Sequence, residues 1–260
     1  MGQLVEVTIE SGVAVVAIAN PPMNVMNQAV GAELLDAFRS LEHADDVVVV
    51  VLCGKGERAF MAGADIKEFP RALGQPGAAF ALAQGLHALM DCIDHFPKPV
   101  IAALHGFVLG GGMELALACD LRVCEEGTKL GLPEINLGIF PGAGGTQRLP
   151  RLIGEARAKE MMFTGTPVTA QWALQSGLVN RVVPTGQALV AARELASEIA
   201  GKSLPALSRI KQAVDEGSEA TLAVGTWLEA RLFDEVFQTS DSREGVTAFI
   251  EKRQAHFTNR

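Results

Sequence analysis

Residues 98–120 read Lys98-Pro-Val-Ile-Ala-Ala-Leu-His-Gly106-Phe-Val-Leu-Gly110-Gly-Gly-Met-Glu114-Leu-Ala-Leu-Ala-Cys-Asp120. The beginning of this stretch, Lys98–Leu104, is an apolar run of strand length, which predicts a buried strand. The glycines at 110–112 then lead into a predicted helix over Met113–Ala118. A buried strand, a glycine turn and a helix in succession are typical of an α/β fold, so this stretch decides the predicted fold class.

The same alternation extends in both directions along the chain. Strands and helices are predicted in turn up to about residue 183, as in an α/β protein. The predicted strands are a hairpin of Leu4–Ile9 and Val13–Ala19, and the segments Asp45–Cys53, Leu121–Cys124 and Lys129–Leu130. The predicted helices are Gln28–Glu42 and a longer one that begins near Ala78 and contains Gly85–Phe96.

After Pro184 the pattern becomes helical. Asp241, with Glu244 three residues later, resembles a capping box at the start of the last helix. The apolar faces of these helices exceed what a single short layer buries, so we expect them to serve an oligomer interface. The predicted helices are Ala188–Ala200, Ala206–Glu216, Ala220–Phe237 and Ser242–His256.

Composition excludes several classes of protein. With 260 residues and 48% hydrophobic content, the chain can bury a large core. Its net charge of −8 argues against general attraction to nucleic acid or to an anionic membrane. The most strongly apolar unbroken stretch, Val47–Cys53, is too short to span a bilayer. The first basic residue is Arg39, so we expect a cytoplasmic protein, or a matrix protein whose transit peptide has been removed.

Cysteine and histidine usage gives no sign of a metal site. The four cysteines form no C-x-x-C pair and lie in apolar segments, so we expect small buried side chains in a reducing compartment. The five histidines are scattered without metal-ligand spacing, and no bound metal is expected. The cysteines are Cys53, Cys92, Cys119 and Cys124, and the histidines are His43, His87, His95, His105 and His256.

Gly110–Gly112 directly precedes a short predicted helix. A helix N-terminus offers free N–H groups and the positive end of a dipole, which suits an oxyanion. The alternative is that these glycines only allow tight packing of helix on strand. Neither this tripeptide nor Gly142-Ala-Gly-Gly-Thr-Gln147 matches the dinucleotide fingerprint, and no Walker A motif occurs.

Two glutamates lie in glycine-rich surroundings and are the candidate proton-transfer pair. Glu114 falls in the first turn of the predicted helix, whose dipole favours its anionic form and hence a role as base. Glu134 follows Pro133 in an apolar stretch, where desolvation would raise its pKa and suit it to donate a proton. The alternatives are an ordinary carboxylate at a helix dipole for Glu114 and an outward or salt-bridged carboxylate for Glu134.

The segment Phe60-Met-Ala62-Gly-Ala64-Asp-Ile-Lys67 is a loop of small residues followed by charged ones. Small residues allow a ligand to approach the backbone closely. The alternative is a tight turn in which Asp65 acts as a cap.

These motifs together resemble the enoyl-CoA hydratase/isomerase (crotonase) superfamily and, within it, the short-chain enoyl-CoA hydratases. The resemblance runs nearly end to end. It implies a spiral of β-β-α turns, with a catalytic core over residues 1–200 and a C-terminal helical oligomerisation region over 201–260 that forms trimers, usually paired into hexamers. The matching stretches are Asn20-Pro-Pro22, Phe60–Phe69, Lys98–Gly106, Leu109–Asp120, Gly131–Leu149 and Gly245–Phe257.

The resemblance also implies roles for single residues. The N–H groups of Ala64 and Gly111 would form the oxyanion hole, and Glu114 and Glu134 would be the two catalytic glutamates. Coenzyme A, which is part of the substrate and not a cofactor, would contact Gly111 and the loop residues Ala62, Ala64, Asp65, Ile66 and Lys67. Phe249 and Lys252 would reach it either within one subunit or across a subunit boundary.

The reaction expected from this resemblance is hydration of a trans-2-enoyl-CoA to a 3-hydroxyacyl-CoA. One rival is a Δ3,Δ2-enoyl-CoA isomerase or another reaction through the same enolate, and the presence of both glutamates favours hydration over it. A rival of another class is an RNA-binding protein, with Arg148, Arg151, Arg157 and Lys159 as a basic patch. The net charge of −8 argues against this second rival.

Overall fold

The chain repeats one unit three times: a longer strand, a short strand and a helix. In the computed structural model, which describes residues 3–259, the longer strands build a six-stranded sheet of order β1-β2-β3-β5-β7-β10. The short strands build a second sheet of order β4-β6-β8-β9. The three units are β3 (Val49–Gly54), β4 (Ala59–Met61) and α2 (Ala78–Asp94); β5 (Val100–Leu104), β6 (Phe107–Leu109) and α3 (Gly111–Leu117); and β7 (Leu121–Glu125), β8 (Lys129–Gly131) and α4 (Gly145–Ile153). This arrangement confirms the expected α/β class and its β-β-α turns.

The four middle strands of the large sheet are buried on both faces. The antiparallel hairpin of β1 (Val5–Glu10) and β2 (Val13–Ile18) forms one edge, and β2, β3, β5, β7 and β10 (Arg181–Val183) run parallel. Val50 and Leu52 point into the main core, which α1 (Gln28–Glu42) and α2 also enter, whereas Val49 and Val51 pack toward α7 (Ala188–Ala200). Strands covered on both faces read as continuous apolar runs, which explains why Asp45–Cys53 was predictable as a buried strand.

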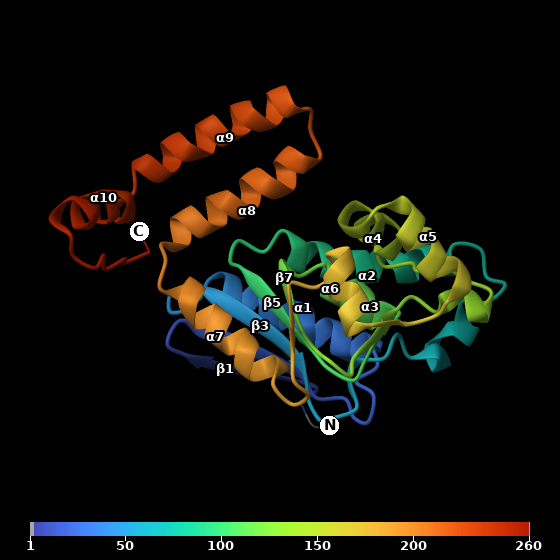
Figure 1. Cartoon of the computed structure of the whole chain (residues 1–260). Helices are drawn as coiled ribbons and strands as arrows, with labels where there is room; N and C mark the ends of the chain where they lie inside the picture. The colour runs from blue at the N-terminus through green and yellow to red at the C-terminus, as the bar shows by residue number, and fades with distance from the viewer. Residues whose placement is uncertain (1–2, 260) are drawn as a thin grey trace.

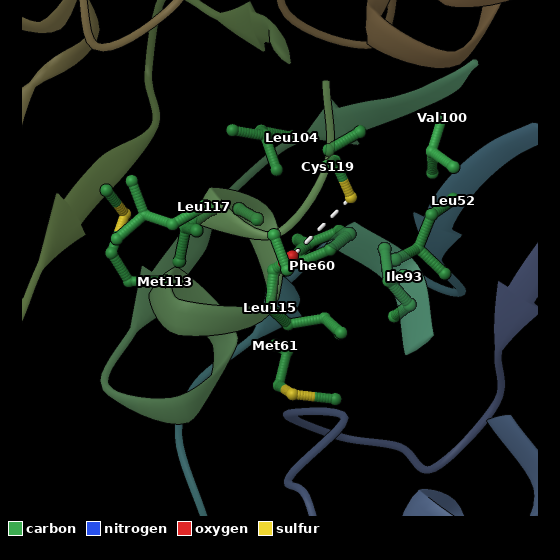
Figure 2. Packing of buried hydrophobic residues seen from close by; sticks show 14 of the residues in the cluster. Leu52, Phe60, Met61, Ile93, Val100, Leu104, Met113, Leu115, Leu117 and Cys119 are labelled. Carbon is green, nitrogen blue, oxygen red and sulfur yellow. Dashed lines mark hydrogen bonds between the residues drawn. The ribbon is translucent and has the colours of Figure 1, made fainter. Parts of the chain in front are cut away.

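Helix α3 lies in the centre of the molecule. Figure 2 shows its residues Met113, Leu115 and Leu117 among Phe60, Met61 and Leu104 from neighbouring strands. Gly112 permits this approach, because a Cβ at that position would overlap the carbonyl group of Met61 in β4. The glycines at 110–112 therefore do serve tight packing, the alternative raised from the sequence, at Gly112 at least.

Several elements between residues 134 and 183 were not predicted from the sequence, because they are short and none exceeds ten residues. Helix α4 packs on α3, and α5 packs on both α4 and the 3-10 helix η2, so these elements form a layer beside the central helix. The elements are η2 (Glu134–Leu137), α4, α5 (Glu155–Thr164), β9 (Val168–Thr169), α6 (Ala170–Ser176) and β10.

Three helices at the C-terminus extend away from the sheets as an arm (Figure 1). The arm consists of α8 (Leu204–Ser218), α9 (Leu222–Phe237) and α10 (Ser240–Glu251), with α8 and α9 packed on each other. Lys211 of α8 ties the arm to the core by an ion pair of 3.0 Å with Asp120, close after the end of α3. The predicted C-terminal helices are thus present.

The last predicted helix was wrong at both ends. It stops at Glu251 instead of His256, because Lys252 adopts a left-handed conformation with φ 57°. Its N-cap is Thr239, whose side chain accepts from the Ser242 N–H, so Asp241 and Glu244 do not form a capping box. The buried Asp241 carboxylate instead accepts from the N–H groups of Thr258 and Asn259, which fixes the tail after the helix.

Candidate active site

Glu114 is a buried carboxylate with two backbone donors. Its Oε1 accepts from the N–H of Ala143 at 2.7 Å and from the N–H of Gly145 at 2.9 Å. Burial raises the pKa of Glu114 above its ordinary value, while the N–H groups of Gly145 and Ala143 oppose the rise. Both donors come from the start of α4, while Glu114 lies in the first turn of its own helix α3, as the sequence predicted.

Glu134 has fewer hydrogen-bond partners than Glu114. It begins the 3-10 helix η2, and its Oε2 is buried without a hydrogen-bond partner among the described residues. Burial raises its pKa to about 7, its own backbone N–H opposes the rise, and the charge of Glu114 adds to it. This is the desolvated carboxyl group that the apolar sequence around Pro133 predicted.

The two carboxyl groups belong to one site. A Cβ added to Gly110 would lie 3.0 Å from Glu134 Oε1, and one added to Gly145 would lie 3.0 Å from Glu114 Oε1. Gly110 immediately precedes α3, which carries Glu114, and the charge of Glu114 contributes to the raised pKa of Glu134. The structure therefore places one anchored and one unanchored carboxyl group near the N-terminus of α3.

Two backbone N–H groups point into the same region. Gly63 O and Asp65 N bond to Met26, so the N–H of Ala64 faces the opposite side, toward α3. A Cβ added to Gly111 would lie 3.6 Å from the Ala64 nitrogen. Within residues 3–259 the backbone supplies no acceptor for the N–H of Ala64 or of Gly111. The pair is therefore available to a ligand oxygen.

These groups meet because three parallel strands end at one edge of the small sheet. Ala64, Gly111 and Glu134 each follow, within three residues, the end of β4, β6 or β8. Strands β4, β6 and β8 are parallel neighbours, so their carboxyl ends lie together. Ligands of α/β proteins commonly bind beyond the carboxyl ends of parallel strands.

The loop 62–67 borders this region. The N–H of Ala62 donates to Met23 O, which fixes the start of the loop. Asp65 caps the 3-10 helix η1 (Ile66–Arg71) by accepting from the Lys67 N–H at 3.1 Å, so the capping alternative raised from the sequence holds for this side chain. Ile66 and Lys67 are exposed.

Phe249 and Lys252 are not brought to the two glutamates within one chain. Phe249 lies on α10 with 85% of its surface exposed, and Lys252 ends that helix. In Figure 1, α10 lies at the far end of the arm from α3. The candidate site of a single chain therefore consists of the glutamates, the N–H pair and the 62–67 loop.

Comparison with known proteins assigns the family. A family model described as enoyl-CoA hydratase/isomerase matches residues 8–260. This chain belongs to the enoyl-CoA hydratase/isomerase family. It is 40% identical to a probable enoyl-CoA hydratase of Bacillus subtilis, over 97% of this chain and 98% of the relative. It is 39% identical to the short-chain-enoyl-CoA hydratase of Clostridium acetobutylicum, over 96% of each chain.

Solved structures of this family have the same fold. A crystal structure of an enoyl-CoA hydratase from Bacillus anthracis superposes with a TM-score of 0.94 at 38% identity, over 99% of this chain and all of the other. Residues 3–259 of this family member were also compared with the requirements of metal sites and membrane-spanning helices. No group of His, Cys, Asp and Glu side chains there is arranged to hold a metal ion, and no helix there is long and apolar enough to cross a membrane.

Sequence reasoning missed the groups that hold Glu114 in this enoyl-CoA hydratase/isomerase family member. Ala143 and Gly145 lie in the Gly142–Gln147 stretch, whose glycines do not match the dinucleotide fingerprint. A glycine-rich turn before a helix does indicate available N–H groups, but nothing in one sequence tells which carboxylate they bind. The four cysteines are free thiols as expected, with Cys92 half-buried and Cys53, Cys119 and Cys124 buried.

Proposed function

We propose that this chain is an enoyl-CoA hydratase that adds water across the C2=C3 double bond of a trans-2-enoyl-CoA. One observation carries the proposal: an anchored carboxylate and an unanchored carboxyl group with a raised pKa share a site with two available N–H groups. Two carboxyl groups whose surroundings differ in this way can divide the base and acid roles.

In the proposed reaction, Glu114 takes a proton from water as its oxygen bonds to C3. The electron pair of the double bond moves toward the thioester, and negative charge collects on its carbonyl oxygen. The N–H groups of Ala64 and Gly111 stabilise that charge, each contributing roughly two to three powers of ten in rate. Glu134 then donates its proton to C2, which completes the 3-hydroxyacyl-CoA.

We extend the proposal to the remaining contacts. The 62–67 loop contains Ala64, one member of the N–H pair, so in this proposal the loop would contact the part of coenzyme A next to the thioester. Phe249 and Lys252 lie on the arm and would reach coenzyme A only in a neighbouring copy. The arm exposes large apolar side chains, including Trp227 at 66% and Phe233 at 62%, which supports a homotrimer or a hexamer built from trimers.

The rival RNA-binding function is less well supported. Of its four basic residues, Arg148 pairs with Asp91 and Asp94, Arg151 with Glu219, and Lys159 with Glu155. Acidic side chains beside these basic ones lower the local positive potential that phosphates would meet.

Identification of the product tests the proposal and separates it from the isomerase. The wild-type chain, given crotonyl-CoA, should form 3-hydroxybutyryl-CoA, whereas an isomerase acting on a 3-enoyl-CoA yields only a migrated double bond. Glu114→Gln and Glu134→Gln should each lower kcat by about 10²- to 10⁴-fold, because each removes one proton-transfer group.

The exposed Glu160→Gln on α5 is the matched control and should leave kcat unchanged. Hydration by either active-site variant at near the wild-type rate would exclude the role given to that glutamate. A wild-type chain that shifts double bonds without adding water would support the isomerase instead.

A further inference from the structure

Arg148 joins two helices beside the site without entering it. Its Nε donates to Asp94 Oδ2 at 2.9 Å, and a second guanidinium nitrogen lies 2.9 Å from Asp91 Oδ1 and 2.8 Å from Asp94 Oδ2. Both carboxylates belong to α2, whereas Arg148 belongs to the first turn of α4. A fork-shaped guanidinium bound to two carboxylates fixes orientation as well as distance.

The guanidinium group of Arg148 lies directly over the turn that binds Glu114. A Cβ on Gly144 would overlap the end of this group, and φ at Gly144 is +105°, a conformation that favours glycine. The residues on either side of Gly144 are Ala143 and Gly145, whose N–H groups hold Glu114 Oε1. Any movement of this turn therefore moves both donors of the carboxylate.

We propose that Arg148 is a positioning residue for Glu114: by binding Asp91 and Asp94, it fixes the Ala143–Gly145 turn and so the direction in which the Glu114 carboxylate points. This inference rests on the proposed function, because it gives Glu114 the role of base. Arg148 itself is separated from Glu114 by the turn and has no direct part in the reaction.

The charge of Arg148 acts together with other groups near Glu114. His87 and Arg148 both lower the pKa of Glu114, and Glu134 is the nearby group of like charge. Arg148 lines a groove of about 1220 Å³ between α2, α4 and α8. The other charged or titratable residues of that groove are His87, Asp91 and Asp94 on α2, His95 at the C-cap of α2, Cys119, Asp120 and Arg122 after α3, Arg151 on α4, Lys211, Asp215 and Glu216 on α8, and Glu219.

Arg151 provides a matched control on the same helix. It pairs with Glu219 at 3.0 Å, but its side chain is 57% exposed, whereas that of Arg148 is 18% exposed. Exposed ion pairs contribute little. Arg151 also lies beyond the turn that binds Glu114.

The first experiment measures steady-state hydration of crotonyl-CoA by Arg148→Gln, Arg148→Lys and Arg151→Gln. We expect Arg148→Gln to lower kcat about ten- to a hundredfold with KM within about twofold, because displacement of a reacting group costs up to about 10²-fold in rate. Arg148→Lys should recover only part of the loss, since an ammonium group keeps the charge but not the two-point contact. Arg151→Gln should match the wild type.

A second variant separates positioning from charge and serves if Arg148→Gln fails to fold. Asp94→Asn weakens the two-point contact but keeps the Arg148 charge. We expect it also to lower kcat, without moving the acidic limb of the pH profile upward. Arg148→Gln removes a positive charge that lowers the pKa of Glu114, so its acidic limb should move to higher pH.

The outcomes are distinguishable. If the wild type hydrates crotonyl-CoA while Arg148→Gln and Asp94→Asn both keep its kcat, the positioning role is excluded and the proposed function stands. If the wild type hydrates no enoyl-CoA, the proposed function fails first. A change of KM alone in both variants would assign Arg148 to substrate binding and overturn the inference.

Discussion

Helix α3 and helix α9 use apolar residues in opposite ways. Six of the seven residues of α3 are buried, and its side chains meet other parts of the same chain on every face. Only two of the sixteen residues of α9, Leu228 and Leu232, are buried, although the helix also carries Trp227, Phe233 and Phe237 on its exposed surface. A helix surrounded by its own chain can hold a site rigidly, whereas one with an uncovered apolar face is built to meet another surface.

Two neighbouring glycines of α3 test whether this buried helix holds the site rigidly. Gly111→Ala should lower kcat about 10²- to 10³-fold at nearly unchanged stability, because its methyl group, 3.6 Å from the Ala64 nitrogen, crowds the proposed oxyanion position. Gly112→Ala should instead prevent stable folding, because its methyl group overlaps the Met61 carbonyl.

Thermal unfolding and kcat measured on both glycine variants provide the check. A stable Gly112→Ala chain would show that the centre of the molecule yields more readily than its packing indicates. Full activity in Gly111→Ala would remove the Gly111 N–H from the proposed mechanism.

Two neighbouring residues of α9 test whether its exposed apolar face contacts another copy of the chain. Leu232 is 2% exposed, so Leu232→Ala should cost about 2–5 kcal/mol of the stability of the arm. Phe233 is 62% exposed, so Phe233→Ala should change the stability of one chain by less than about 0.5 kcal/mol but weaken assembly.

Chemical denaturation and sedimentation velocity separate these two effects. A Phe233→Ala chain that sediments as the wild type at all concentrations would show that this part of α9 does not contact another copy.

The carboxyl groups of Glu134 near α3 and Glu244 in the arm are expected to titrate at very different pH values. Burial raises the pKa of Glu134 to about 7, whereas hydrogen bonds from Arg253 hold the pKa of Glu244 in the arm near 2. The proposed acid must be protonated, so kcat/KM for hydration should fall about tenfold per pH unit as pH rises above the Glu134 pKa. Because the carboxyls of Glu114 and Glu134 interact, the measured limbs belong to the pair.

At low pH activity should fall for the opposite reason, because the proposed base Glu114 must be deprotonated. Its raised pKa means that the base becomes protonated at a higher pH than an ordinary carboxyl group, so activity should be lost there as pH falls. Glu244→Gln should leave both limbs of the profile in place. A hydration rate that is constant from about pH 6 to pH 9 would contradict the acid role of Glu134.

The parts of the fold that could be predicted are those determined by residues close together in the sequence. Gln28–Glu42 and Ala188–Ala200 were predicted with the observed bounds, because each has an apolar stripe at helical spacing. The desolvation of Glu134 also follows from its immediate neighbours. By contrast, α4 is only nine residues long and mixes glycine, proline and charge, so it was not predicted as a helix.

The unpredicted parts depend on contacts between distant residues. The N–H groups that hold Glu114 come from about thirty positions later in the chain, at Ala143 and Gly145. Asp241 looked like a helix cap, but its carboxylate is taken by residues 258 and 259, which return to it only after the helix has ended. Such pairings arise from the tertiary fold and leave no mark at either position of a single sequence.

The meeting of three parallel strand ends at one edge of the small sheet has a consequence for how this site can change. Ala64, Gly111 and Glu134 are each supplied by a different β-β-α unit. A new residue, or a longer loop after β8, can therefore replace the proposed proton donor while the units that present the two N–H groups keep their geometry. One scaffold of this kind can acquire new reactions by exchanging a single loop at a time, in evolution or by design.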